Sequence, residues 1–139
     1  MLELRPDDTQ ILNNLAYLAV DCGSDLALAR SRAEEAVAAK PASAEFRDTL
    51  GVILLAQAKE IADSDPEARD LAVRKAEQEL KQATRLSQSV SPWLHLSELY
   101  LFQNRPDEAR RAVAKASDLD EDGRFQEKFD ALLEEIKDR

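Results

Sequence analysis

Apolar residues recur every three to four positions along nearly the whole chain, which is the spacing of an amphipathic α-helix. Short turns rich in Gly, Pro, Asp and Ser interrupt this spacing. No segment alternates apolar and polar residues in the way that a half-buried β-strand does. The pattern predicts an all-α fold of about seven helices, over residues 9–21, 26–39, 44–62, 66–87, 92–103, 106–117 and 123–138.

The ends of these helices carry local signals. Asp65 before Pro66, and Ser91 before Pro92, each combine an N-cap residue with a proline at the first helical position. Asn104 is suited to the left-handed conformation that ends a helix. Because the turns are short, consecutive helices are expected to pack antiparallel as hairpins.

Small and large residues recur at matched positions in three pairs of helices. The small residues should let two helix backbones approach closely, and the large residues should fill the remaining gaps. The small residues are Ala16, Gly51, Ser97, Ala29, Ala76 and Ala109. The large residues are Leu15, Leu50, Leu96, Tyr100 and Leu80.

The clearest copy of this pattern places Trp93, Leu96, Ser97 and Tyr100 on one helix, and it continues with Ala109, Val113 and Ala116 on the next. This spacing resembles the tetratricopeptide repeat, with Ser97 in place of the usual Gly. The resemblance covers roughly residues 1–121. It implies an α-solenoid of antiparallel helix hairpins that winds into a right-handed superhelix.

The resemblance also implies one domain over residues 1–139. Repeat 1 would span about 8–41, repeat 2 about 43–88, repeat 3 about 91–121, and a capping helix about 123–138. The capping helix is expected to bury one apolar stripe, and a dimerisation stripe is the alternative interpretation. That stripe comprises Phe125, Phe129, Leu132, Leu133 and Ile136.

Repeat 2 carries additional residues between its two helices, from about Lys59 to Lys75. Ile61 and Leu71 could pair within a longer hairpin, with the acidic segment 63–65 in water at its tip. Added helical turns would make this hairpin project past its neighbours. A disordered loop is the alternative.

Composition narrows the function. The chain has 28 acidic and 19 basic residues and a net charge of −9, which disfavours nucleic acids and anionic membrane surfaces as partners. No apolar run is long enough to cross a membrane. The segment Met1–Pro6 lacks a basic stretch followed by an apolar one, so a cytoplasmic location is the default expectation.

The sequence offers little for catalysis. Its one histidine, His95, has no companion that would make it a base or a metal ligand, and its one cysteine, Cys22, has acidic neighbours. We expect Cys22 to be a small buried thiol. There is no phosphate-binding glycine loop and no calcium-loop spacing. We therefore predict that the protein is not an enzyme and that it needs neither a metal nor a cofactor.

In the tetratricopeptide family, the first helix of each hairpin lines a groove that holds a peptide or partner protein. The resemblance thus implies an adaptor or scaffold that binds a protein partner at matched positions. These positions are Asn13, Asn14, Tyr17, Asp48, Val52, His95, Glu98 and Phe102. The alternative is a structural segment of a longer solenoid, or a self-association module without a specific ligand in the groove.

The first residues suggest a continuation of the pattern. Pro6 precedes Leu12 by the interval that separates Pro41 from Arg47, so Leu2–Pro6 resembles the last turn of a preceding repeat. The chain is therefore expected to be part of a longer repeat protein. An unpartnered first hairpin would expose apolar residues, and self-association through residues 1–20 would cover them.

Overall fold

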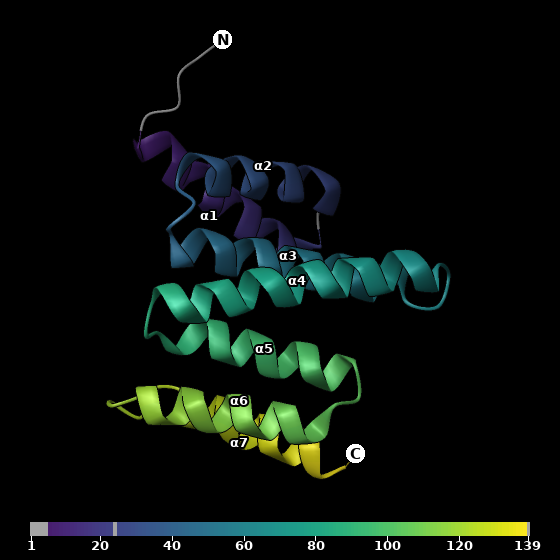
Figure 1. Ribbon diagram of the computed structural model, residues 1–139, viewed down its shortest axis with the longest axis vertical. Coiled ribbons are helices and arrows are strands. Elements are labelled where there is room, and N and C mark those ends of the chain that lie inside the picture. The colour runs from purple at the N-terminus through teal and green to yellow at the C-terminus, as the bar shows by residue number, and fades with distance from the viewer. Residues whose placement is uncertain (1–5, 24, 139) are drawn as a thin grey trace. The chain divides into compact units, whose positions relative to one another are not determined.

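The computed structural model describes residues 6–23 and 25–138 of the chain. Within these ranges the backbone forms helices and no strand (Figure 1). The helices are α1 (Pro6–Cys22), α2 (Leu26–Ala39), α3 (Ala44–Ile61), α4 (Pro66–Leu86), α5 (Val90–Phe102), α6 (Pro106–Leu119) and α7 (Gln126–Lys137). The prediction of an all-α fold with seven helices is confirmed, and most bounds agree to within a few residues.

Consecutive helices pair as expected: α1 packs on α2, α3 on α4, and α5 on α6, while α7 packs mainly on α6. The helices belong to two compact units, Met1–Leu86 and Ser87–Arg139. The first unit contains α1–α4 and the second contains α5–α7, and each has buried apolar residues of its own.

Side-chain caps begin α2, α3 and α4. Asp25 accepts from the backbone N–H of Leu28 at 3.1 Å, and Ser43 accepts from that of Phe46 at 3.2 Å. Asp65 accepts from the N–H of Ala68 at 3.2 Å, as the Asp-Pro pair predicted. Each cap satisfies one of the N–H groups that have no partner within the helix.

The predicted cap at Ser91 is wrong, because α5 begins at Val90 and Ser89 is its N-cap residue, with no side-chain hydrogen bond. Pro92 is tolerated inside the first turn, since the N–H groups there have no acceptor within the helix in any case. At the other end of α5, Asn104 has φ +58°, as predicted, and the next N–H, of Arg105, donates to the carbonyl of Tyr100 at 2.8 Å.

Helices α3 and α4 approach each other closely at Gly51 of α3. A methyl group built on Gly51 would lie 2.5 Å from Cγ of Leu80 and 3.4 Å from the carbonyl oxygen of Ala76, both on α4. Leu80 and Ala76 have no exposed surface. The predicted role of Gly51 as the small residue that lets α3 meet α4 is therefore confirmed.

Arg47 of α3 occupies the position where the tetratricopeptide repeat usually has an aromatic residue. Its side chain contacts two other segments, the turn before α3 and helix α4. Its Nε donates to the carbonyl of Pro41 at 2.7 Å, and its Nη1 lies 2.9 Å from Oε2 of Glu79 on α4. Both side chains of this ion pair are mostly covered, at 20% and 23% exposure. The pair thus fixes the turn before α3 relative to α4.

The α3–α4 hairpin is helical through the additional residues of repeat 2. Its helices have 18 and 21 residues, and a short exposed turn, residues 62–65, joins them. Arg69 closes this turn through bonds to the carbonyl of Ala62 and to Asp63, each at 3.1 Å. In Figure 1 the tip reaches beyond α1 and α2, so the stretch forms a projecting arm and not a disordered loop.

In the second unit, α7 buries a narrower stripe than the sequence predicted. Phe129, Leu132 and Ile136 are at most 6% exposed, whereas Leu133 is 37% exposed. Leu133 follows Leu132 directly and therefore points about 100° away from it, off the buried face. Before α7, both carboxylate oxygens of Asp120 accept backbone N–H groups, from Arg124 at 3.1 Å and Phe125 at 3.0 Å.

The segment 2–5, which suggested a preceding repeat, lies outside the described residues. The expectation that the chain continues a longer repeat protein therefore stays a prediction, as do the repeat boundaries and the single domain.

Gly51→Ala is expected to destabilise the protein by about 1–3 kcal/mol, because the added methyl group overpacks against Leu80. Leu80→Ala alone should cost about 2–5 kcal/mol through the cavity that it leaves. In the double variant the overpacking is relieved, so the combined cost should fall below the sum. Urea unfolding followed by circular dichroism measures all three values. If the losses of unfolding free energy in the two single variants simply add in the double variant, the side chains at positions 51 and 80 are not in contact.

The arm should exchange its amide hydrogens slowly over residues 56–61 and 68–75, because these N–H groups bond within helices or to the Asp65 cap. The amide of Asp63, in the exposed turn between the helices, should exchange quickly. Asp65→Ala should accelerate exchange at the start of α4 and leave the end of α3 unchanged. Fast exchange throughout both stretches of the unmodified protein would mean that the arm is not a stable hairpin.

Candidate partner-binding surfaces

The N-terminal half of α1 carries amide side chains that meet the first turn of α3. Gln10 Nε2 donates to Oε1 of Glu45 at 2.9 Å, and Asn13 Nδ2 donates to the same oxygen at 3.3 Å. Gln10 Nε2 also donates to Oδ1 of Asn14 at 3.2 Å. The carboxylate of Glu45 therefore fixes the orientation of two amides on the neighbouring helix.

The predicted groove residues of the first unit divide into buried and exposed ones. Asn13 and Asp48 are buried, at 3% and 8% exposure, and Val52 is half-buried. Asn14 is exposed, and Tyr17 is 38% exposed. Of the predicted contacts, Asn14 and Tyr17 can therefore reach a partner directly, while Asn13 and Asp48 lie beneath them in the packing of the unit.

Asn13 leaves part of its hydrogen-bonding capacity unused. Its Oδ1 is buried and has no hydrogen-bond partner among the described residues. A buried carbonyl oxygen without a donor destabilises the folded state by roughly 1–3 kcal/mol. A small movement of the amide on binding a ligand with an N–H group would recover this loss.

The predicted groove residues of the second unit also differ in their exposure to solvent. His95 is 7% exposed, and its Nδ1 lies 3.5 Å from Oγ of Ser91, one turn earlier on α5. Glu98 is half-buried and forms a loose ion pair with Lys128 of α7, with 3.9 Å between its Oε1 and Nζ. Phe102 is half-buried at the end of α5. Glu98 and Phe102 are the accessible members of this set.

The outward face of α1 is apolar. Ile11, Leu15 and Leu18 are 54%, 42% and 54% exposed, and their spacing places them on one side of the helix. The expectation that Leu15 fills a gap between helices is wrong, because the small Ala16 occupies the buried position, at 0% exposure. The missing neighbour of the first hairpin stays a prediction.

Cys22 is exposed, which corrects the expectation of a buried thiol. It follows Leu18 by four residues and Ile11 by eleven, so it continues the outward stripe of α1. The sequence placed Cys22 near a helix end, but it did not show which side of the helix was free.

A pocket that the sequence did not predict lies between α2 and the arm. Its volume is about 260 Å³. The lining combines apolar side chains of the arm with charged groups, and comprises Arg30, Gln57, Glu60, Ile61, Ala68, Leu71, Ala72 and Lys75. Oε1 of Gln57 is buried, and it too has no hydrogen-bond partner within the described ranges.

No group of three or more His, Cys, Asp or Glu side chains in the described part of the chain could hold a metal ion. Among the same residues, no helix is long and apolar enough to cross a membrane. The accessible chemistry of both units is that of amides, apolar side chains and scattered charges.

The helix pairs, the small residue at the α3–α4 contact and the left-handed ends define the class: an all-α solenoid fold of tetratricopeptide-like helix hairpins. Among solved structures, the chain is similar to the type III secretion translocator chaperone SycD of Yersinia enterocolitica, crystallised as an alternative dimer. The TM-score is 0.74, the sequence identity is 19%, and the match covers 98% of this chain and 96% of SycD. No family model and no curated protein matches the chain. At this identity the likeness establishes the fold alone.

Proposed function

We propose that this protein is a binding module, an adaptor or scaffold that holds a peptide or a partner protein, and not an enzyme. The observation that carries the proposal is the set of amide side chains on α1, Gln10, Asn13 and Asn14. Glu45 orients Gln10 and Asn13, and Oδ1 of Asn13 has no donor among the described residues. The shared fold with a protein described as a secretion translocator chaperone supports the same role.

Side-chain amides suit the recognition of a polypeptide, because each offers both a donor and an acceptor to the peptide groups of an extended chain. Asn14 and Tyr17 would contact the partner, and the buried Asn13 and Asp48 would position them. Val52 would add apolar contact from α3. In the second unit, Glu98 and Phe102 would contact the partner, with His95 beneath them.

The experiment begins with the partner, captured from the source cell and then purified. Its affinity is measured by calorimetry for the unmodified protein and for Asn14→Ala/Tyr17→Ala, whose side chains are exposed. Removal of contacting residues should weaken binding about tenfold or more. A separate Glu98→Ala/Phe102→Ala variant tests whether the second unit takes part.

Ser31→Ala/Glu35→Ala is the matched control, because both positions are exposed on α2. It should bind like the unmodified protein. Asn13→Ala should change the stability by less than about 1 kcal/mol, because a long hydrogen bond and an unsatisfied carbonyl disappear together. A partner that binds all variants equally well, with their helicity intact, would refute this binding surface.

A second candidate function is self-association, which the exposed stripe Ile11, Leu15 and Leu18 favours. Residues 9–20 contain no charged side chain, in a chain of which 34% of the residues are charged. Two copies could therefore meet on α1 without repulsion, despite the net charge of −9. About a twofold axis at Leu15, Ile11 of one copy would face Leu18 of the other.

If this candidate is correct, light scattering should show a dimer at about 100 µM protein, and Leu15→Lys should return it to a monomer. In a Cys22→Ser background, Leu15→Cys should form a disulfide between copies under mild oxidation, because position 15 lies at the axis. Leu28→Lys, at an equally exposed leucine of α2, is the control. A monomer at all concentrations, with α1 as protected from hydrogen exchange as α5, would exclude it.

A further inference from the structure

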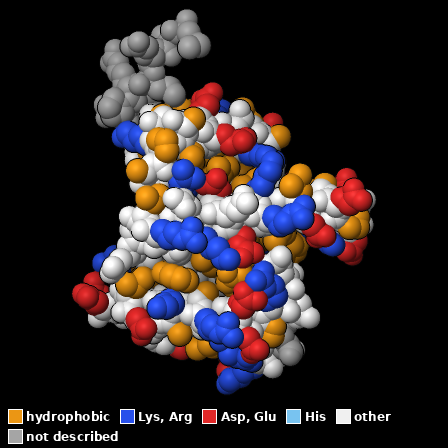
Figure 2. Space-filling view, in the orientation of Figure 1, with side chains coloured by type: hydrophobic (Ala, Val, Ile, Leu, Met, Phe, Trp, Pro, Cys, Tyr) orange, Lys and Arg blue, Asp and Glu red, His pale blue; other side chains and the backbone are white. Residues whose placement is uncertain are grey.

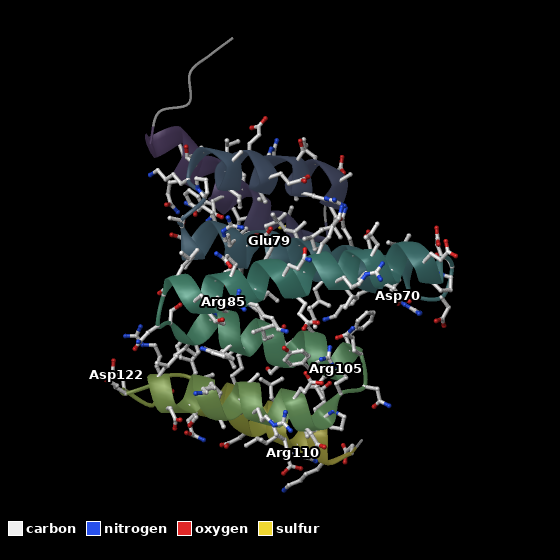
Figure 3. The ribbon with its side chains drawn as sticks, viewed as in Figure 1. Asp70, Glu79, Arg85, Arg105, Arg110 and Asp122 are labelled. Carbon is white, nitrogen blue, oxygen red and sulfur yellow. The ribbon has the colours of Figure 1, made fainter. Side chains whose placement is uncertain are left out.

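The outward face of α4 is basic over its C-terminal two-thirds. The exposed side chains of residues 74–85 are Arg74, Lys75, Gln78, Lys81 and Arg85. Counted from Arg74, four of them follow the spacing of one helical face, and Lys75 lies beside them. Figure 2 shows basic side chains along the course of α4, and Figure 3 labels Arg85 near its C-terminal end. This set is called the basic face below.

The acidic residues of the same stretch are mostly covered. Glu77 is 19% exposed and pairs with Lys81 at 2.7 Å. Glu79, labelled in Figure 3, is 23% exposed and pairs with Arg47 of α3 at 2.9 Å. Residues 74–85 therefore present exposed cations to solvent and no exposed carboxylate.

Most of these cations have no partner among the described residues. Within the described part of the chain, the side chains of Arg74, Lys75 and Arg85 make no ion pair and no hydrogen bond. The chain has 28 acidic residues for 19 basic ones, so carboxylates are plentiful elsewhere on its surface. Lys81 pairs with Glu77, and the other three cations of the basic face form a positive patch on an acidic protein, which attracts negative charge.

The pocket of the arm lies at the N-terminal end of this face. Leu71 and Lys75 belong to the pocket lining, and Lys75 is also a member of the basic face. Ile61, Ala68 and Ala72 make the pocket apolar, although Glu60 adds one carboxylate to its lining. Its volume of about 260 Å³ is large enough for one large apolar side chain.

We infer that α4 binds an acidic segment of a partner protein, with a large apolar residue at one end. The apolar residue enters the pocket beside Lys75, and the carboxylates lie against Arg74 and Arg85. From Arg74 to Arg85 the face is about 16 Å long, which an extended segment of roughly five residues spans. This site is separate from the α1 and α3 residues of the proposed function, so either can fail without the other.

Other anionic ligands fit the observations less well. A nucleic acid would meet the repulsion of a chain with net charge −9, and the basic face has no aromatic side chain on which a base could stack. It would also leave the apolar pocket unused. A second copy of this chain would bring its own acidic surface, but it would produce self-association that depends on the basic face.

The test uses a fluorescein-labelled peptide, Leu-Glu-Ser-Glu-Ser-Glu, and a neutral peptide with Gln in place of each Glu. Fluorescence anisotropy at low salt should show binding of the acidic peptide alone, weakening as salt rises. In NMR spectra its addition should shift the amide signals of residues 68–86. The triple variant Arg74→Gln/Lys75→Gln/Arg85→Gln should bind about tenfold more weakly.

A matched control removes the same charge elsewhere. Arg111→Gln/Lys115→Gln/Arg124→Gln neutralises three exposed cations of the second unit and should change the affinity by less than about twofold. Ala68→Leu fills the pocket without changing the charge of the protein, and it should weaken the binding of the acidic peptide as well. Circular dichroism confirms that each variant is folded.

Four outcomes would overturn the inference. The first two are equal binding of the acidic and the neutral peptide, and an equal loss of affinity in the triple variant and its control. The other two are tighter binding of a short single-stranded oligonucleotide than of the peptide, and self-association that the triple variant abolishes.

Discussion

The close contact of α3 with α4 at Gly51 is the constraint on which the first unit depends. Leu80 and the backbone at Ala76 fill the space that any larger residue would need. The same two helices form the arm, where Ala58, Ala72 and Val73 are at most 7% exposed while Leu71 stays 47% exposed. The ion pair of Arg47 with Glu79 joins these two helices as well.

Small buried residues also decide which surfaces remain free. Ala29, Ala33 and Ala36 of α2 are at most 1% exposed, so that helix packs through short side chains. When contacts between helices use alanine and glycine, the larger side chains project outward from the hairpin. Ile11 and Leu18 on α1 are examples. A repeat built in this way therefore has outer faces whose chemistry can vary without disturbing the core.

Sequence reasoning recovered the parts of the fold that depend on local chemistry. The Asp65 cap, the left-handed Asn104 and the small Gly51 each act on residues nearby or follow a fixed repeat spacing. It failed where the exposed side of a helix mattered, at Leu15 and Leu133, because adjacent leucine and alanine positions give an ambiguous apolar face. The candidate site residues stay a prediction, and the sequence did not show their burial, which separates the exposed Asn14 from the buried Asn13.

The basic face of α4 shows why charge patterns in a sequence are incomplete. In the sequence, residues 74–85 combine four basic side chains with Glu77 and Glu79, so positive charge is already in excess. The excess that faces solvent grows in the fold, because Arg47, 32 positions earlier in the chain, pairs with Glu79. Lys81 is engaged with Glu77, which leaves Arg74, Lys75 and Arg85 unmatched. A tertiary ion pair thus removes one carboxylate from the charge that α4 presents to a partner. The structural role of Arg47 and the charge available to a partner are consequences of the same contact.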